Sequence, residues 1–213
     1  MEITIDDLQR HLPTIQDHQL RTDIQTHGRL LVCSEGTTLL TDRQPIGVVP
    51  LVTRGGVKVI RTTPEHQNLF LYFLRAGETC AMTLSSCLRQ ETSRVRAVTV
   101  ANTEVILLPV ARVYYYTRHY PAWNAFTLQS FQLKFDSILA AFEGLAFASL
   151  DERILRYLRA ITAINDSDRV ALTHETLAEE LGASRVGVSR VLKRLETEGL
   201  VALARGLIVV PHA

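Results

Sequence analysis

The chain has 213 residues and a formal net charge of +1. This length suits one or two domains with a buried core, and the small net charge excludes a protein that coats nucleic acid through bulk positive charge. Three cysteines argue against a secreted disulfide scaffold. Because we find neither a signal-peptide pattern nor an apolar run of about 18 residues, we expect a cytoplasmic protein without a membrane partner.

The first part of the chain predicts a sheet domain. Residues 1–27 are polar with scattered leucine and isoleucine, which indicates one or two short helices. From Gly28 to Pro109, short β-rich runs alternate with turns, a spacing typical of an antiparallel sandwich or roll of about eight strands. The runs are RLLVC, EGTTLL, IGVVPLV, VKVI, LFLYFL, VRAVTV and EVILLPV. The sequence therefore predicts a β-roll domain with short N-terminal helices over residues 1–120.

A long helix is predicted over residues 121–147, with Pro121 in its first turn. One row of apolar residues follows the 3-4-3-4-3 spacing of helices that pair: Leu128, Phe131, Phe135, Ile138, Phe142 and Leu145. A second apolar set lies on another face: Trp123, Phe126, Leu133 and Ala140. One small domain cannot cover two apolar faces. We expect one face to pack on the roll and the paired row to form a dimer interface; the alternative is a helix buried wholly within one chain.

Residues 148–213 predict a winged helix-turn-helix domain after a hinge near Ala148. Capping-box spacing from Ser149 to Glu152 starts one helix, and Thr173 is suited to cap the next. Gly182 is the residue type that ends a helix in a left-handed conformation, and a further helix follows to about residue 198. The two β-rich runs LVAL and LIVV then predict a hairpin, or wing.

The last of these helices has two different faces. Val188, Val191, Leu192 and Leu195 lie on one side, whereas residues 184–194 contain four basic residues and no acidic one. This division suits a helix that packs on its own domain and enters the major groove of DNA. The candidate DNA-binding residues are Ser184, Arg185, Val186, Ser189, Arg190, Lys193, Arg194 and Arg205. The alternatives are a solvated basic face, or a winged helix that binds protein rather than DNA.

A β-roll, a long pairing helix and a winged helix-turn-helix, in that order, resemble the CRP/FNR family of bacterial transcription regulators. The resemblance covers nearly the whole chain and is most specific in LTHETLAEELGASRVGVSRVLKRLETEGLV and in the turns RGGVKV and RAGE. It implies an α+β fold with a jelly-roll sensor domain of the cyclic-nucleotide-binding type. It also implies a homodimer that reads a palindromic operator, with RNA polymerase as a further partner.

The resemblance assigns base and phosphate contacts to Arg185, Ser189 and Arg190. It fails at Val186, where many family members carry a glutamate that reads a cytosine edge. Valine cannot accept that hydrogen bond, but it can contact a thymine methyl group. We therefore expect a half-site that differs from the usual family consensus.

The sensing region also departs from the cyclic-nucleotide-binding members. Ala81-Met82 stand where those members carry Gly-Glu for the ribose, and Glu91-Thr92 stand where they carry Arg-Ser for the phosphate. A glutamate would repel a phosphate, so cAMP is disfavoured, although Arg94 or Arg96 could substitute. An iron–sulfur cluster is disfavoured because the members that hold one have a cluster of N-terminal cysteines, which is absent before Cys33. Haem stays open as a cofactor.

Cys80 and Cys87 flank the segment AMTLSS, where the resemblance places the effector pocket. One hypothesis is a thiol switch, in which oxidation or persulfidation moves the long helix and which needs a low thiol pKa. The other, which we favour, is two small buried apolar residues. The candidate effector or redox residues are Cys80, Met82, Cys87, Arg94 and Arg96.

These patterns predict a homodimeric, sequence-specific transcription regulator that senses a signal other than cAMP. The alternative is a ligand-binding or protein-interaction module whose winged helix does not read DNA. We expect neither an enzyme nor a metal site, because the sequence has no Gly-rich phosphate loop, metal-ligand spacing or nucleophile elbow.

Overall fold

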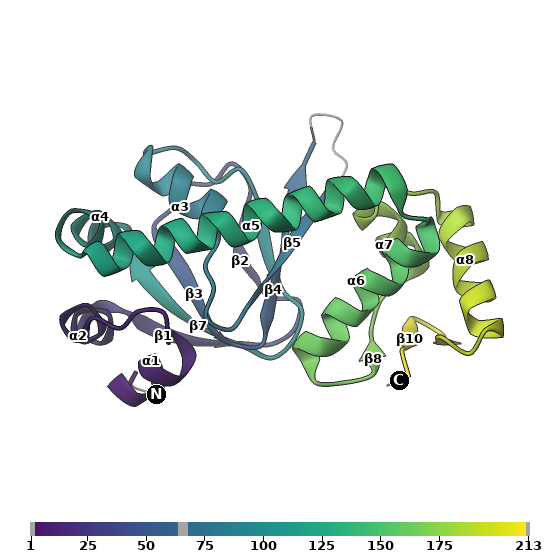
Figure 1. Ribbon diagram of the computed structural model, residues 1–213, viewed down its shortest axis with the longest axis horizontal. Helices are drawn as coiled ribbons and strands as arrows, with labels where there is room; N and C mark the ends of the chain where they lie inside the picture. The colour runs from purple at the N-terminus through teal and green to yellow at the C-terminus, as the bar shows by residue number, and fades with distance from the viewer. Residues whose placement is uncertain (1–2, 64–67, 212–213) are drawn as a thin grey trace.

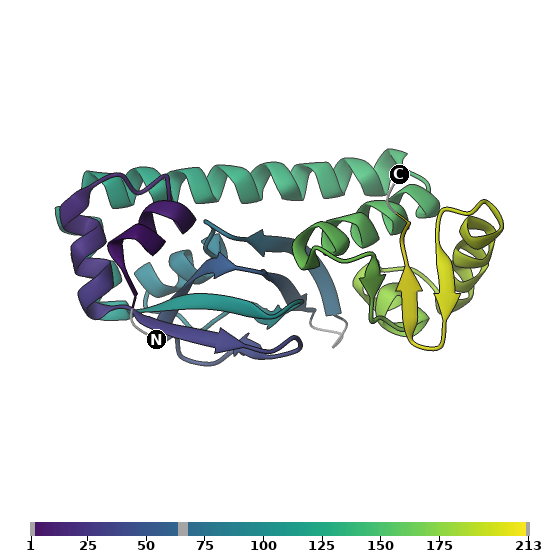
Figure 2. The same ribbon diagram turned by 90° about the horizontal axis from the view of Figure 1, so that it is seen from below.

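The fold is organised along one helix, α5 (Pro121–Phe147), which passes over the sheets and reaches the C-terminal helices (Figure 1). This computed structural model describes residues 3–63 and 68–211, without the side chains of residues 141–147. Seen from below, the sheets lie along one side of α5 and the C-terminal domain lies beyond them (Figure 2). The bounds of α5 are those predicted for the long helix.

Two antiparallel sheets form the roll. The first has the order β1-β7-β3, with β1 at Arg29–Cys33, β7 at Thr103–Pro109 and β3 at Val48–Arg54. The second has the order β2-β6-β4-β5, and its strands are Thr38–Leu40, Arg96–Thr99, Gly56–Thr62 and Asn68–Arg75. Apolar side chains from both sheets fill the space between them, including Val52, Val59 and Val105. The predicted α+β fold with a cyclic-nucleotide-binding-like roll is therefore confirmed.

Four short helices accompany the sheets, and the sequence predicted only the first two. These are α1 (Ile5–His11) and α2 (His18–His27). The missed helices are α3 (Ala81–Leu88) and α4 (Val110–His119). A cysteine thiol caps α3 and no side chain caps α4, whose sequence is rich in β-branched and aromatic residues. The usual start signals were therefore missing in both places.

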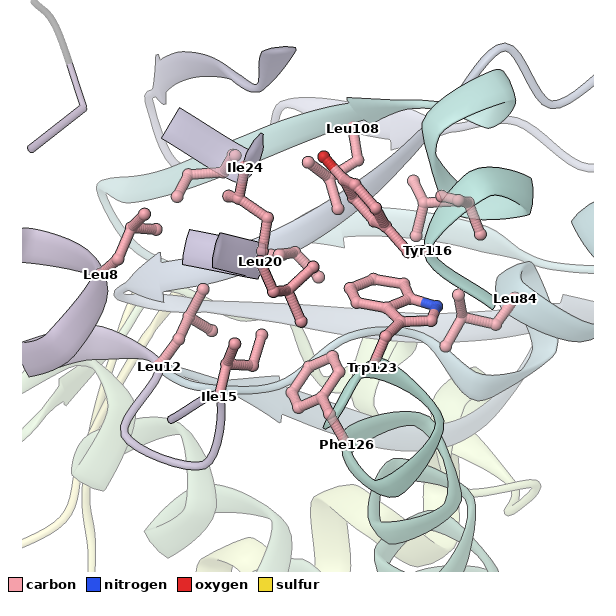
Figure 3. Close-up of a cluster of buried hydrophobic side chains, with 14 of the residues drawn as sticks. Leu8, Leu12, Ile15, Leu20, Ile24, Leu84, Leu108, Tyr116, Trp123 and Phe126 are labelled. Atoms are coloured by element: carbon pink, nitrogen blue, oxygen red, sulfur yellow. The ribbon is translucent and has the colours of Figure 1, made fainter. Parts of the chain in front are cut away.

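The first turns of α5 are anchored in the core of the roll. Trp123 and Phe126 are buried, and Figure 3 shows the indole ring of Trp123 between Tyr116, Leu84 and Phe126. The ring centroids of Trp123 and Tyr116 are 5.3 Å apart. The expectation that this apolar face packs on the roll is confirmed for these two residues.

The same expectation is wrong for Leu133 and Ala140, which are exposed. The face of α5 that continues along the roll instead buries Ser130 and Lys134. Lys134 Nζ donates to the carbonyl of Phe73 at 3.1 Å and also pairs with the carboxylate of Glu78. A buried ammonium group is tolerated here because these acceptors satisfy it.

The C-terminal domain has its own core and the predicted order of elements. It consists of α6 (Leu150–Asn165), β8 (Arg169–Val170), α7 (His174–Glu180), α8 (Arg185–Thr197), β9 (Ala202–Ala204) and β10 (Leu207–Val209), with sheet order β8-β10-β9. The predicted caps are present: Ser149 forms a capping box with Glu152, and Thr173 and Ser184 accept backbone N–H groups. These local signals explain why this part was predictable from sequence.

Candidate nucleic-acid interface and effector pocket

Helix α8 is held rigidly at its start and along one face. The hydroxyl of Ser184 accepts the N–H of Gly187 at 3.1 Å, which satisfies one free donor of the first turn. Val188 and Leu192 are fully buried in the core of the domain. The preceding turn uses Gly182 at φ +59°, a conformation that favours glycine. The opposite face of α8 is therefore presented to solvent in a defined orientation.

Three of the predicted contact residues form the exposed centre of this face. Val186 is 70% exposed, and Arg185 and Arg190 are exposed on either side of it. The guanidinium group of Arg190 has no hydrogen bond or ion pair within the described part of the chain, and Arg185 Nε lies 4.0 Å from a Glu175 oxygen. An exposed valine between two exposed guanidinium groups suits contact with base edges and phosphates.

The remaining polar candidates on α8 already have partners. Ser189 Oγ lies 3.0 Å from His174 Nδ1, and Lys193 Nζ lies 2.7 Å from Glu196. Arg194 pairs with Asp151 at the start of α6. Arg194 is thus better placed to hold α8 against α6 than to reach a phosphate. The sequence did not point to His174, whose role depends on a contact 15 residues away.

The wing candidate is Arg205. It is exposed in the turn between β9 and β10, beside Gly206 at φ +70°. The short hairpin places its guanidinium group in solvent, free of ion pairs within the described residues. This position is compatible with a contact to the DNA backbone.

A cavity of about 240 Å³ lies between α3 and α5, where the effector pocket was expected. Met82 and Arg94 line it, as predicted, together with Phe131 and Phe135 of α5. Cys80 and Cys87 are not among its lining residues, nor is Arg96, which lies in β6. The structure therefore brings together only two of the five candidate effector residues.

Glu91 in this cavity is balanced by arginines. Its carboxylate accepts hydrogen bonds from Arg89 Nε and from Arg94, each at 2.8 Å. The hydrogen bond from Arg89 and the charges of both arginines lower the pKa of Glu91. The repulsion that Glu91 exerts on an anion is thus weaker than the sequence alone indicated, because two cations flank it.

Both cysteines beside the cavity are buried thiols. Cys80 Sγ accepts the N–H of Thr83 at 3.4 Å and lies 3.6 Å from the hydroxyl of Tyr72. Burial raises the pKa of Cys87 to about 11. A reactive thiolate needs a low pKa and access to solvent, so these features favour the structural interpretation over the thiol switch.

The roll also contacts the C-terminal domain directly. Lys58 of β4 forms an ion pair with Glu180 at the end of α7, and the Tyr157 hydroxyl of α6 donates to the same carboxylate. Burial and the adjacent Glu180 charge raise the pKa of Tyr157. Sequence could not predict this junction, because Lys58 and Glu180 are 122 positions apart.

Among the described residues, no group of three or more His, Cys, Asp or Glu side chains could hold a metal ion. Within the same residues, no helix has the length and apolar character needed to cross a membrane.

Comparison with known proteins agrees with this architecture. Residues 152–212 match the Crp-like helix-turn-helix domain. The global nitrogen regulator of Synechocystis sp. is 23% identical over 181 residues, which are 81% of this chain and 80% of that protein. The structure of a CRP/FNR-family transcriptional regulator from Eubacterium rectale is 24% identical with a TM-score of 0.77, covering 93% of this chain and 92% of that one.

A second solved structure is similar along the same length. The c-di-GMP-responsive global regulator CLP of Xanthomonas campestris has a TM-score of 0.75 at 19% identity, covering 92% of this chain and 100% of that one. At such identities the structural likeness shows the fold, and the proteins matched are regulators rather than enzymes. Together, these comparisons show that residues 152–212 form a Crp-like helix-turn-helix domain and that the chain has the fold of CRP/FNR-family transcription regulators.

Proposed function

We propose that this protein is a CRP/FNR-type transcription regulator, a homodimer that reads a specific palindromic operator with α8 and responds through its roll to a signal other than cAMP. The observation that carries the proposal is the solvent-facing surface of α8, where Val186 lies between Arg185 and Arg190 while the apolar face is buried. Such a surface combines phosphate attraction with a side chain that can discriminate bases.

The dimer is supported by an exposed apolar row on α5. Leu128 is 71% exposed and Phe135 is 62% exposed, and Phe131 and Ile138 continue the same row. Soluble monomers rarely leave such a row uncovered, whereas a second copy of the helix would bury it. The predicted interface residues Phe142 and Leu145 lie outside the described side chains. A two-fold dimer would present its α8 helices to half-sites about 34 Å apart.

A signal other than cAMP is supported by the cavity between α3 and α5. Met82 lines this cavity, and the family resemblance places it where the cyclic-nucleotide-binding members carry a carboxylate for the ribose. A thioether is only a weak acceptor for a sugar hydroxyl. The family resemblance places Glu91 at the phosphate position, and this carboxylate already engages Arg89 and Arg94, so both cations are paired within the protein. RNA polymerase is a further partner within this proposal, and transcription from a promoter that carries the selected operator would test it.

Binding-site selection from random duplexes tests the DNA-reading role. We expect the full-length protein to enrich a palindrome with two half-sites about one helical turn apart. Recovery of no enriched sequence would instead favour a winged helix that binds ligand or protein rather than DNA. Titrations of the enriched duplex must be made at one salt concentration, because phosphate contacts make affinity strongly salt-dependent.

Sedimentation of single variants tests the dimer separately. Phe135→Glu places a charge in the exposed row, so we expect a monomer with greatly reduced affinity for the full palindrome. Gln132→Glu is the matched control, because Gln132 is exposed on the same helix outside the row. A dimeric Phe135→Glu protein would show that the interface lies elsewhere.

A further inference from the structure

A second cavity lies where the roll, α5 and the C-terminal domain meet, and residues of β5, α5 and α6 line it. Figure 1 shows how these three elements are arranged. Its volume is about 430 Å³, within the range of small-molecule sites. Only Tyr72 and Lys134 line both this cavity and the one beside α3. The two cavities are therefore distinct spaces on either side of Lys134.

Aromatic rings form one wall of this junction cavity. Phe70 and Phe73 of β5 have ring centroids 4.6 Å apart, and Tyr157 of α6 lies 5.2 Å from Phe70 and 5.5 Å from Phe73. Leu133 and Ala140 line the cavity from α5. Both side chains are exposed, so packing on the roll does not account for apolar residues at these two positions. The wall suits the apolar body of a ligand.

The acidic groups that line the cavity are satisfied within the protein. Glu78 pairs with Lys134 and accepts the backbone N–H of Arg75 at 2.8 Å. Glu180 is bound by Lys58 and by the hydroxyl of Tyr157. Neither carboxylate is left to attract a cation.

The arginines that line the cavity are not balanced in this way. The guanidinium groups of Arg75 and Arg156 have no acceptor among the described residues, and both residues are exposed. Within the described part of the chain, Arg153 donates only to the carbonyl of Leu181. The cavity thus combines an aromatic interior with positive charge that the described residues do not neutralise.

We propose that this junction cavity binds a small amphipathic anion. An aromatic or alkyl body would pack among Phe70, Phe73 and Tyr157, and a carboxylate, sulfonate or phosphate head would accept hydrogen bonds from Arg75 and Arg156. Guanidinium groups recognise such heads through paired N–H donors.

Binding of a ligand in the cavity would also affect α8, the proposed DNA-reading helix. Arg75 belongs to the roll and Arg156 to α6, so a shared anion would tie the two domains together. Arg153 holds the carbonyl of Leu181, directly before the turn that leads into α8. This regulatory consequence rests on the proposed DNA-reading function, whereas binding of the anion does not.

Two probes test the binding site on the full-length protein without DNA. Anilinonaphthalene sulfonate reports binding by fluorescence, and dodecanoate competes with it or is titrated by calorimetry. We expect saturable binding of both. Arg156→Gln should weaken it about tenfold, the effect of losing one hydrogen bond to a charged group. Arg118→Gln, exposed on α4 and not among the residues that line the cavity, should bind as the wild type.

A cavity-filling variant makes the test independent of charge. Ser137→Phe projects from α5 into the space, so the fluorescence component assigned to the cavity should disappear, and any signal that persists belongs to other apolar surfaces. Circular dichroism establishes whether each variant is folded. If Ser137→Phe does not fold, the comparison of wild type with Arg156→Gln alone decides whether the cavity binds the anion. Absence of saturation, or equal binding by wild type, Arg156→Gln and folded Ser137→Phe, would overturn the proposal. Loss of DNA binding would leave these titrations unchanged.

Discussion

Val186 provides the most direct test of the proposal that α8 reads DNA. Its side chain is 70% exposed in the free protein, so its burial against a thymine methyl group would be a gain made only on binding. Val186→Ala removes two carbons, each contributing about 0.8 kcal/mol when fully buried. When this value is scaled by the exposed fraction of the side chain, the variant should lose about 1 kcal/mol of binding free energy per half-site, or about sixfold in affinity. Folding stability should change by less than about 0.5 kcal/mol, because the side chain is at the surface.

The assay is fluorescence anisotropy on the selected duplex, at fixed salt, with thymine in each half-site replaced in turn by deoxyuracil. This replacement removes only the methyl group. At the contacted position, replacing thymine by deoxyuracil should lower the affinity of the wild type about as much as Val186→Ala does. The same replacement should not lower the affinity of the Val186→Ala variant any further. If the losses of affinity from deoxyuracil and from Val186→Ala are additive at every thymine position, the proposed contact is refuted. Val186→Glu should shift the preference toward cytosine by about 1–3 kcal/mol per half-site.

Other predictions concern the charged face, the core and a buried thiol. Arg190→Ala should lower specific affinity by about 1–3 kcal/mol, whereas Lys193→Ala should weaken all sequences alike and reduce the salt slope by about 1, both measured by titration across salt concentrations. Trp123→Ala should destabilise the fold by about 3–5 kcal/mol in urea unfolding, because the indole is fully buried. Burial raises the pKa of Cys87 from 9.0 to about 11, so its contribution to stability is complete below pH 9 and is lost as the pH rises toward 11. Thermal unfolding of Cys87→Ala should therefore depend less on pH in that window than unfolding of the wild type.

The helix-turn-helix was the most predictable part of the molecule. The caps at Ser149, Thr173 and Ser184 and the apolar spacing of α8 are local signals, and the structure places all of them as expected. Helices α3 and α4 were missed because their starts have no ordinary cap. Of the candidate effector residues, only Met82 and Arg94 line the expected pocket, because a strand position such as Arg96 can face either side of a sheet.

The sequence by itself determined the order of elements in the C-terminal domain, the bounds of α5 and the two faces of α8, since these follow from caps, turn residues and apolar spacing within a few positions. Only the tertiary structure decided that Lys134 rather than Leu133 is buried along α5, that Arg194 pairs with Asp151, and that Glu180 joins Lys58 and Tyr157. The physical reason is that these groups are satisfied by partners distant in the chain. The same long-range packing brings β5, α5 and α6 together around the junction cavity, which no local sequence pattern predicts.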